Sequence, residues 1–480
     1  MAFTVLRILF FILSIVGTTF IIPILTALFC GEFDVIPSFL VPMAVSWIFG
    51  ALCVILGRKK KSVLHIRSSF AVVALAWTVS SLFGAVPFYF SGAIPSVTDA
   101  VFESVSGFTT TGATILTEIE QLPRSVHMWR CLTHWLGGMG IVALTVALLP
   151  VLGVGGFQLI KAETTGPEKG KFTPKITTTA KILWFIYLGM TAAQAVLLHL
   201  AGMDVIDSLC HAFSTLGTGG FSTRNASIGS YQSALIDWIC TVFMFGAGIN
   251  FSLYFYLFTG NFGEIRRNSE LKAYIGIVFA AVLLVTFFQA SYYGGFFSSL
   301  RFSAFQVASI ISTTGFATSD YTLWKPVAQV VILMLLFIGG CSGSTAGGVK
   351  VVRWVILYKQ FKNEMLKMMH PHGIFSVRLN QRSGRRDVVF SVAAFFFLYF
   401  ALIIATSFFG SLFGMDIQTS FTGALTMVGN TGPAFGMLGP SYSCSWLAVP
   451  VKWWYCLAMI AGRLELFTVF VFLTPAYWRK

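Results

Sequence analysis

Charged residues are scarce in this chain. Only 10% of its 480 residues are Asp, Glu, Lys or Arg, whereas 56% are hydrophobic and the mean hydropathy is +0.80. A soluble domain with that balance would expose far too much apolar surface to water. The composition therefore excludes a sizeable soluble domain and predicts a polytopic membrane protein.

Metal and catalytic motifs are also missing. The eight cysteines include no CxxC pair, and most lie in or beside apolar runs, so we expect structural roles rather than disulfides or metal sites. The sequence has no Walker A motif, no zinc-ligand spacing and no Ser/His/Asp set in a plausible frame. These absences argue against an enzyme and predict no cofactor in this chain. No connection is long enough for a nucleotide-binding fold, so nucleotide control requires a separate subunit.

Apolar runs long enough to cross a bilayer recur along the whole chain. The first could be mistaken for a signal peptide, but it is too long, lacks a small-residue cleavage site and leads into another span. We therefore interpret it as a retained helix. The predicted spans are residues 5–29, 37–57, 69–91, 127–152, 178–201, 233–258, 274–293, 326–348, 388–412 and 448–474.

The formal charge of +14 is distributed unevenly. Most basic residues lie in connections on one side of the spans, which the positive-inside rule explains by placing that side and both termini in the cytoplasm. A nucleic-acid partner is not expected. Most acidic residues, including Glu103 and Asp207, lie outside these loops, where we expect them to concentrate cations. The basic connections are residues 58–67, 161–181, 266–272, 350–386 and 479–480.

A Thr-Gly pair recurs four times, at intervals of roughly a hundred residues, which indicates an internal repeat. Each pair follows a segment too short to cross a bilayer but suited to a re-entrant half-helix. One span precedes each half-helix and one follows, so all repeats share one orientation and can surround a central axis. The pairs are Thr111–Gly112, Thr218–Gly219, Thr314–Gly315 and Thr431–Gly432, and the half-helices are residues 96–109, 205–216, 302–313 and 417–429.

The predicted fold is therefore an all-α polytopic membrane protein with pseudo-fourfold symmetry around a central pore. Two extra N-terminal transmembrane helices occupy residues 1–66. Four span–pore-helix–span repeats follow, at residues 67–176, 177–272, 273–386 and 387–480.

The repeated Thr-Gly segments have the properties of an ion filter. Irregular backbone at membrane depth survives only where protein or a water-filled cavity satisfies its polar groups. Four extended segments on one axis could turn carbonyl oxygens inward to replace the hydration shell of an ion. Glycine permits the positive φ that this needs, and the half-helix C-termini favour a cation. The alternative is that small residues merely permit tight helix packing, but four equivalent occurrences favour a cation selectivity filter.

Glycines also recur in the span after each half-helix. In the first two repeats, at Gly137–Gly138 and Gly246–Gly248, we expect them to let helices approach or bend. Residues 339–348 include five glycines, two serines and a threonine, which would break a helix unless the segment lined water. Arg463 lies within the last span, where we favour a pore-lining role over an ion pair with Glu465 or snorkelling.

These motifs resemble the Trk/Ktr/HKT potassium transporter superfamily, and the two extra N-terminal helices resemble its TrkH-type membrane subunits. The likeness covers residues 70–475. It implies potassium uptake across the bacterial inner (plasma) membrane, a homodimer among membrane lipids, and a separate cytosolic nucleotide-binding subunit of the TrkA type. A potassium symporter of the same fold, coupled to protons or sodium, is the alternative, and a membrane-embedded enzyme is a distant third.

The resemblance also implies the roles of individual residues. It places a potassium filter at the four Thr-Gly segments, and it makes residues 339–348 an intramembrane loop that obstructs the pore below them. Sodium-preferring plant relatives have serine where this chain has Gly112. The filter residues are Thr110, Thr111, Gly112, Ala113, Gly217, Thr218, Gly219, Gly220, Thr313, Thr314, Gly315, Phe316, Asn430, Thr431, Gly432 and Pro433; the gate residues are Gly339, Gly340, Gly343, Ser344, Thr345, Ala346, Gly347, Gly348 and Arg463.

Overall fold

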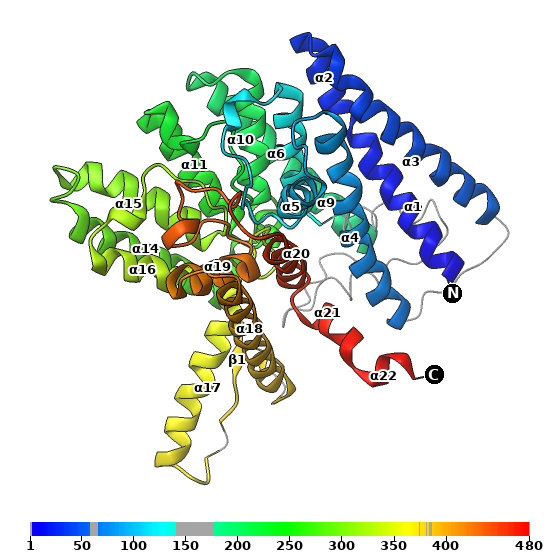
Figure 1. Ribbon diagram of the computed structural model, residues 1–480. Coiled ribbons are helices and arrows are strands. Elements are labelled where there is room, and N and C mark those ends of the chain that lie inside the picture. Colours follow the sequence, from blue (N-terminus) through cyan, green and yellow to red (C-terminus); the bar gives the residue numbers. More distant parts are fainter. Residues whose placement is uncertain are drawn as a thin grey trace.

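The structure is a computed structural model that describes residues 2–57, 66–140, 176–373, 375–380, 382–383 and 386–479. Most of this part of the chain is helical (Figure 1), with one short antiparallel hairpin of β1 (Arg378–Leu379) and β2 (Arg382–Ser383). The predicted connections at residues 58–67 and 161–181, and the end of the span predicted at 127–152, lie largely outside the described residues.

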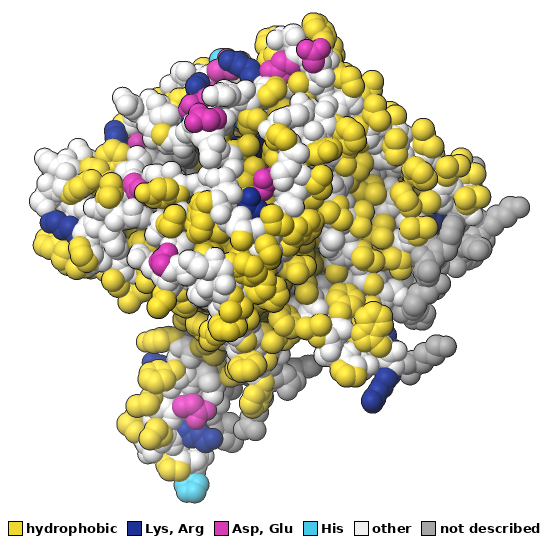
Figure 2. Space-filling model, in the orientation of Figure 1, with side chains coloured by type: hydrophobic (Ala, Val, Ile, Leu, Met, Phe, Trp, Pro, Cys, Tyr) yellow, Lys and Arg dark blue, Asp and Glu magenta, His cyan; other side chains and the backbone are white. Residues whose placement is uncertain are grey.

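Six helices in the described part of the chain are long and apolar enough to cross a membrane. They confirm six of the predicted spans and the all-helical membrane architecture. Hydrophobic side chains cover most of the visible face, whereas charged side chains gather at its upper edge and on the lower projection (Figure 2). The spans comprise α1 (Ala2–Thr19) with α2 (Ile21–Cys30), α3 (Ile36–Gly57), α4 (Ile66–Phe90), α9 (Ile176–Leu200), α14 (Ser269–Gln289) and α18 (Arg386–Leu412).

Four shorter helices correspond to the predicted half-helices: α5 (Val97–Phe108), α10 (Val205–Gly217), α15 (Phe296–Ile311) and α19 (Ile417–Gly429). Three begin at a side-chain N-cap, because Ser96, Asp204 and Asp416 accept hydrogen bonds from backbone N–H groups of the first turn. Hydrogen bonds from Thr419 lower the pKa of the Asp416 carboxyl, which keeps this cap ionised. The third half-helix starts at Phe296 rather than at residue 302 as predicted.

The helices that follow the half-helices are interrupted. α11 (Ala234–Ala247) and α12 (Phe251–Phe258) meet at 96°, and α20 (Val449–Arg463) meets the segment of α21 (Phe467–Phe470) and η7 (Val471–Leu473) at 110°. α16 (Pro326–Leu336) ends before an irregular stretch. The spans predicted at 233–258 and 448–474 are therefore bent, which hydropathy does not reveal because it stays high across a break. The break within 326–348 is the one that the glycines of residues 339–348 indicate.

The N-terminal helices α1, α2 and α3 pack against repeat one. Trp129 in α6 (Arg124–Gly138) contacts both Phe20, at the junction of α1 and α2, and Phe108, the last residue of α5, with ring centroids 4.6 and 6.0 Å apart. Glu32, between α2 and α3, accepts hydrogen bonds from the backbone N–H groups of Arg124 and Ser125 at 2.7 and 3.0 Å. These contacts fix the extra helices to the start of α6.

The segment at residues 350–386, predicted as a connection, contains the 19-residue helix α17 (Val351–Met369), which forms the lower projection in Figure 1. The C-terminus lies beside the start of α4, because the Tyr477 hydroxyl donates to the Arg67 carbonyl at 3.0 Å. Both termini lie on the same side in Figure 1. The remaining helical turns are η1 (Phe33–Val35), η2 (Ile119–Gln121), η4 (Ser227–Tyr231), α13 (Phe262–Arg267), η5 (Tyr321–Leu323), η6 (Gly436–Leu438) and α22 (Pro475–Trp478).

The hydrogen bonds between Glu32 and the start of α6 predict that removing this carboxylate lowers the stability of the protein. Glu32→Ala leaves the first N–H groups of α6 without these acceptors and should lower the free energy of unfolding by about 1 kcal/mol. Thermal unfolding of the purified protein in detergent measures the change. Asp34→Asn, at an exposed carboxylate two residues away, is the control and should leave the unfolding temperature unchanged. Equal effects of both changes would contradict the capping role.

Candidate ion pathway

The four segments that follow the half-helices share one backbone conformation. The first residue of each is left-handed, with φ of 55° at Thr110, 54° at Thr218, 55° at Thr313 and 53° at Asn430. Two residues later comes a glycine with positive φ, and these glycines are Gly112, Gly220, Gly315 and Gly432, with φ between 79° and 87°. Repeat four fits this pattern despite Pro433, so the four strands are alike.

The four strands also form a closed ring. A Cβ atom built on Gly112 would overlap the carbonyl oxygen of Gly219 in repeat two. The same overlap runs onward from repeat two to repeat three, from three to four, and from four back to one. Only glycine permits this approach of neighbouring backbones. The glycine and carbonyl pairs are Gly112 with Gly219, Gly220 with Thr314, Gly315 with Thr431, and Gly432 with Thr111.

The ring corrects the predicted register of repeat two. Thr218–Gly219 was aligned with the other Thr-Gly pairs, but Thr218 has the conformation of Thr110 and Gly220 that of Gly112. The segment equivalent to residues 110–113 is therefore 218–221, which adds Phe221 and removes Gly217. Because the sequence contains two adjacent glycines after Thr218, a dipeptide match could not select the correct one.

The predicted gate residues lie directly against this ring. The N–H of Gly347 donates to the hydroxyl of Thr313 at 2.7 Å, and a Cβ on Gly347 would lie 2.5 Å from the Gly429 carbonyl oxygen. Cys341, Thr345 and Ala346 are all almost fully buried. Residues 339–348, here called the loop, thus pack under the strands of repeats three and four.

Hydrogen bonds hold the loop in place. Its Cys341 N–H donates to the Gly248 carbonyl at 2.8 Å, and its Gly343 carbonyl accepts from the Phe251 N–H at 3.0 Å, so it fills the break between α11 and α12. On the other side, Glu270 at the start of α14 accepts from the Ser342 N–H at 2.6 Å. Nothing in the sequence singles out Glu270, whose importance follows only from this contact.

Arg463 lies beside the loop. Its guanidinium donates to the carbonyls of Thr345 at 2.8 Å, Gly137 at 2.6 Å and Gly138 at 3.0 Å, and so joins the loop to the end of α6. Glu465, the alternative partner considered from the sequence, instead forms an ion pair with Arg353 at 2.5 Å. Arg463 therefore lies among polar backbone groups below the ring.

The glycines of the first two repeats have the expected packing roles. A Cβ on Gly137 would overlap the Phe108 carbonyl oxygen, and one on Gly138 would lie 2.6 Å from the Cα of Gly217, so α6 passes against the ends of α5 and α10. Gly246 and Gly248 lie at the break between α11 and α12. Close approach in repeat one and bending in repeat two are both confirmed.

Two of the acidic residues that were expected to concentrate cations, Glu103 and Asp207, are paired inside the protein. Glu103 is fully buried and pairs with Arg130 at 2.5 Å, and Asp207 pairs with Arg224 at 3.4 Å while accepting from the Tyr231 hydroxyl at 2.7 Å. A paired and buried carboxylate contributes little long-range field. The expectation that Glu103 raises the local cation concentration was therefore wrong.

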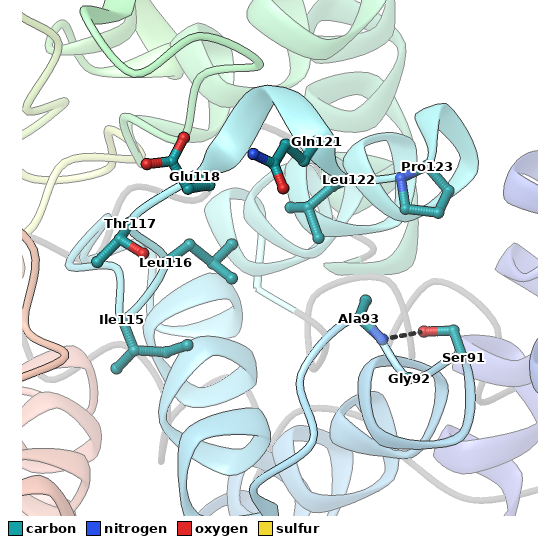
Figure 3. Close-up of a pocket in the computed structure, with 10 residues that line it drawn as sticks. All are labelled: Ser91, Gly92, Ala93, Ile115, Leu116, Thr117, Glu118, Gln121, Leu122 and Pro123. Atoms are coloured by element: carbon teal, nitrogen blue, oxygen red, sulfur yellow. Dashed lines mark hydrogen bonds between the residues drawn. The ribbon is translucent and has the colours of Figure 1, made fainter.

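A pocket of about 460 Å³ lies at the flank of repeat one, between the turn at residues 91–93 and the connection at 115–123. Figure 3 shows the Glu118 carboxylate pointing away from Ser91 and Ala93, so its polar groups do not converge. In the described ranges, no group of three or more His, Cys, Asp or Glu side chains could hold a metal ion. The ring is therefore the candidate site for ion binding.

Comparison with known proteins agrees with this geometry. The family model TrkH, described as "Cation transport protein", matches residues 36–480. The chain belongs to the TrkH family. This confirms the resemblance drawn from the motifs, and the family is one of transport proteins rather than enzymes.

The individual relatives cover nearly the whole chain. The Trk system potassium uptake protein TrkH of Halomonas elongata is 38% identical over 99% of both chains, and that of Escherichia coli K12 is 38% identical over 88% of both. The crystal structure of the potassium transporter TrkH from Vibrio parahaemolyticus matches with a TM-score of 0.89 and 34% identity over 100% of both chains. The fold is therefore that of a solved transporter.

The geometry of the ring predicts that a substitution of Gly112 changes the selectivity between potassium and sodium. Serine there would place its Cβ on the Gly219 carbonyl and adopt an unfavourable positive φ, at a cost of about 1–2 kcal/mol. We expect Gly112→Ser to lower the ratio of potassium to sodium permeability about tenfold, since 1.4 kcal/mol corresponds to a factor of ten. Reversal potentials in liposomes give this ratio.

Gly414→Ser is the matched control. Gly414 has φ of 85°, but a Cβ there meets no atom within 4 Å, so this change carries the backbone cost without touching the ring. It should leave the permeability ratio unchanged. An unchanged ratio in Gly112→Ser would remove Gly112 from the ion pathway.

Proposed function

We propose that this chain takes up potassium ions through the ring formed by its four half-helix strands. The observation that carries the proposal is the closed ring itself, in which four alike strands from one chain place equivalent carbonyls against neighbouring glycines. Rings of backbone carbonyls can replace the hydration shell of potassium. The names of the relatives, which are potassium uptake proteins, support the same ion.

The surroundings of the ring favour a cation. The C-terminal ends of four half-helices point toward the strands, and each carries a partial negative charge. Gly112, Gly220 and Gly315 keep partial exposure among buried neighbours, as expected for residues that face an open path. The proposed filter residues are those of the sequence prediction with the register of repeat two corrected to 218–221.

The loop and Arg463 form the proposed gate. The loop packs under the ring, and the charge of Arg463 lies close beneath it. A cation leaving the ring would meet a fixed positive charge and an obstructing backbone, and both are unfavourable for passage. Opening then requires the loop to leave its hydrogen-bonding partners in the α11–α12 break.

The remaining parts of the proposal concern the assembly. The chain acts as the membrane subunit of a Trk system in the bacterial inner membrane, with cytoplasmic termini, as a homodimer, and with a cytosolic TrkA-type subunit that binds nucleotide. The projecting helix α17 and the basic residues around it, such as Lys359 and Lys362, offer a surface to such a partner. The other long basic connection, at residues 161–181, lies largely outside the described residues.

Flux measurements test the transport proposal. The purified chain in liposomes should pass potassium and rubidium faster than sodium and lithium, and the reversal potential should follow the potassium gradient alone. A reversal potential that shifts with a proton or sodium gradient would instead show coupled symport. Liposomes with no cation flux above protein-free controls, under both low and high potassium, would contradict the proposal.

Deletion of residues 343–346 tests the gate. Removing the centre of the loop takes away the obstruction and should raise flux in the absence of any cytosolic partner. Arg463→Ala should do the same more weakly, because it removes only one bond to the loop. The double change should add less than the sum, since both act on one obstruction.

Arg463→Lys separates charge from hydrogen bonding. Lysine keeps the positive charge but lacks the planar fork that joins three carbonyls, so wild-type flux in this variant would assign the effect to charge. A folded loop deletion whose partner-free flux equals or falls below that of the wild type would show that the loop is not the gate.

A further inference from the structure

A buried ion pair lies directly behind the ring. The Glu103 side chain in α5 is 0% exposed and that of Arg130 in α6 is 1% exposed, with Nε and Oε1 at 2.5 Å. Removing two such charges from water costs several kcal/mol each, so the pair persists only if further hydrogen bonds satisfy it. The residues that form those hydrogen bonds show which parts of the protein the pair connects.

Those partners belong to the strands of two repeats. Glu103 accepts from the Thr114 hydroxyl at 2.9 Å and from the Ile115 N–H at 3.0 Å, just beyond the ring residues of repeat one. Arg130 donates through Nη1 to the Ser222 carbonyl of repeat two at 2.8 Å and lies 3.9 Å from the centre of the Phe221 ring. Glu103 thus bonds to the strand of repeat one and Arg130 to the strand of repeat two, and the ion pair links the two strands.

The other repeats lack this arrangement in the described residues. The half-helix residues equivalent to Glu103 are His211, Gln306 and Gly423, each at the same distance in sequence from its strand. The ring nitrogens of His211 bond to the Asp207 carbonyl at 2.7 Å and to the Ser222 hydroxyl at 2.9 Å, both in its own repeat. The amide atoms of Gln306 are buried without a hydrogen-bond partner, and Gly423 has no side chain. In the described residues, an ion pair that links neighbouring strands, here called the brace, is therefore found at one junction of the ring, between repeats one and two.

We propose that Glu103 and Arg130 are positioning residues for ion selectivity. They fix the separation of the repeat-one and repeat-two strands, so that the ring keeps the width suited to potassium and cannot contract around sodium. This inference rests on the proposed filter function. The pair acts on the strands rather than on the ion, because its hydrogen bonds go to Thr114, Ile115 and Ser222, which lie beyond the segments 110–113 and 218–221.

The test compares permeability ratios in a neutral version of the pair. Glu103→Gln combined with Arg130→Gln removes both charges together, so no unpaired charge stays buried. Hydrogen bonds to charged groups are stronger than those between neutral groups. Their loss at this junction should lower the potassium-to-sodium permeability ratio about tenfold, which corresponds to about 1.4 kcal/mol. Reversal potentials in liposomes measure it.

Arg130→Lys is the second variant and keeps the charges balanced. A lysine ammonium lacks the fork that reaches Glu103 and Ser222 in one fixed geometry, so this variant should fold and still lose selectivity. A purely structural role would lower the unfolding temperature and leave the ratio unchanged. A wild-type ratio in either folded variant would overturn the inference.

The matched control is the pair Asp237–Arg301, at 3.3 Å between α11 and α15. Both side chains are largely buried, but neither bonds to a ring strand in the described part of the chain. Asp237→Asn with Arg301→Gln should lower stability without changing the permeability ratio. If the wild type itself does not discriminate between potassium and sodium, the proposed function fails, which is distinct from failure of the brace alone.

Discussion

Every backbone polar group at membrane depth must find a hydrogen-bond partner inside the protein, because lipid offers none. The four half-helices meet this constraint in the same way, with N–H groups of the strand bonded back into the last helical turn, as from Thr111 to the Ser106 carbonyl at 2.9 Å. The breaks in repeats two and three satisfy each other. The loop donates to Gly248 and accepts from Phe251, so two interruptions that would each be costly become one bonded unit.

Part of this arrangement could be predicted because its signals are local. A short apolar helix between an N-cap and a glycine is visible in the sequence, and α10 and α19 begin within a residue of their predicted starts. The loop was also recognisable, since so many glycines cannot form a stable helix. The register of repeat two could not be recognised from the sequence. Gly219 and Gly220 differ only in backbone conformation, which depends on the neighbouring strand.

Other features depend on contacts between distant segments. Hydropathy does not distinguish a straight span from α11 and α12, whose apolar halves meet at 96°. Glu103 was expected to face solvent, because its partner Arg130 lies in another helix and nothing in the sequence links the two. The importance of Glu270 likewise arises only from the position of the loop. Pairing of buried charges is a property of the fold, and the sequence supplies only the candidates.

The ring is built by one chain rather than by four identical subunits. In a homotetramer, a change in one codon alters every quarter of the pore at once, and any departure from symmetry is forbidden. Here each quarter has its own codons, so repeat three can carry a loop of glycines while repeat four carries Arg463. Mutations can therefore alter the ring in single steps, one quadrant at a time.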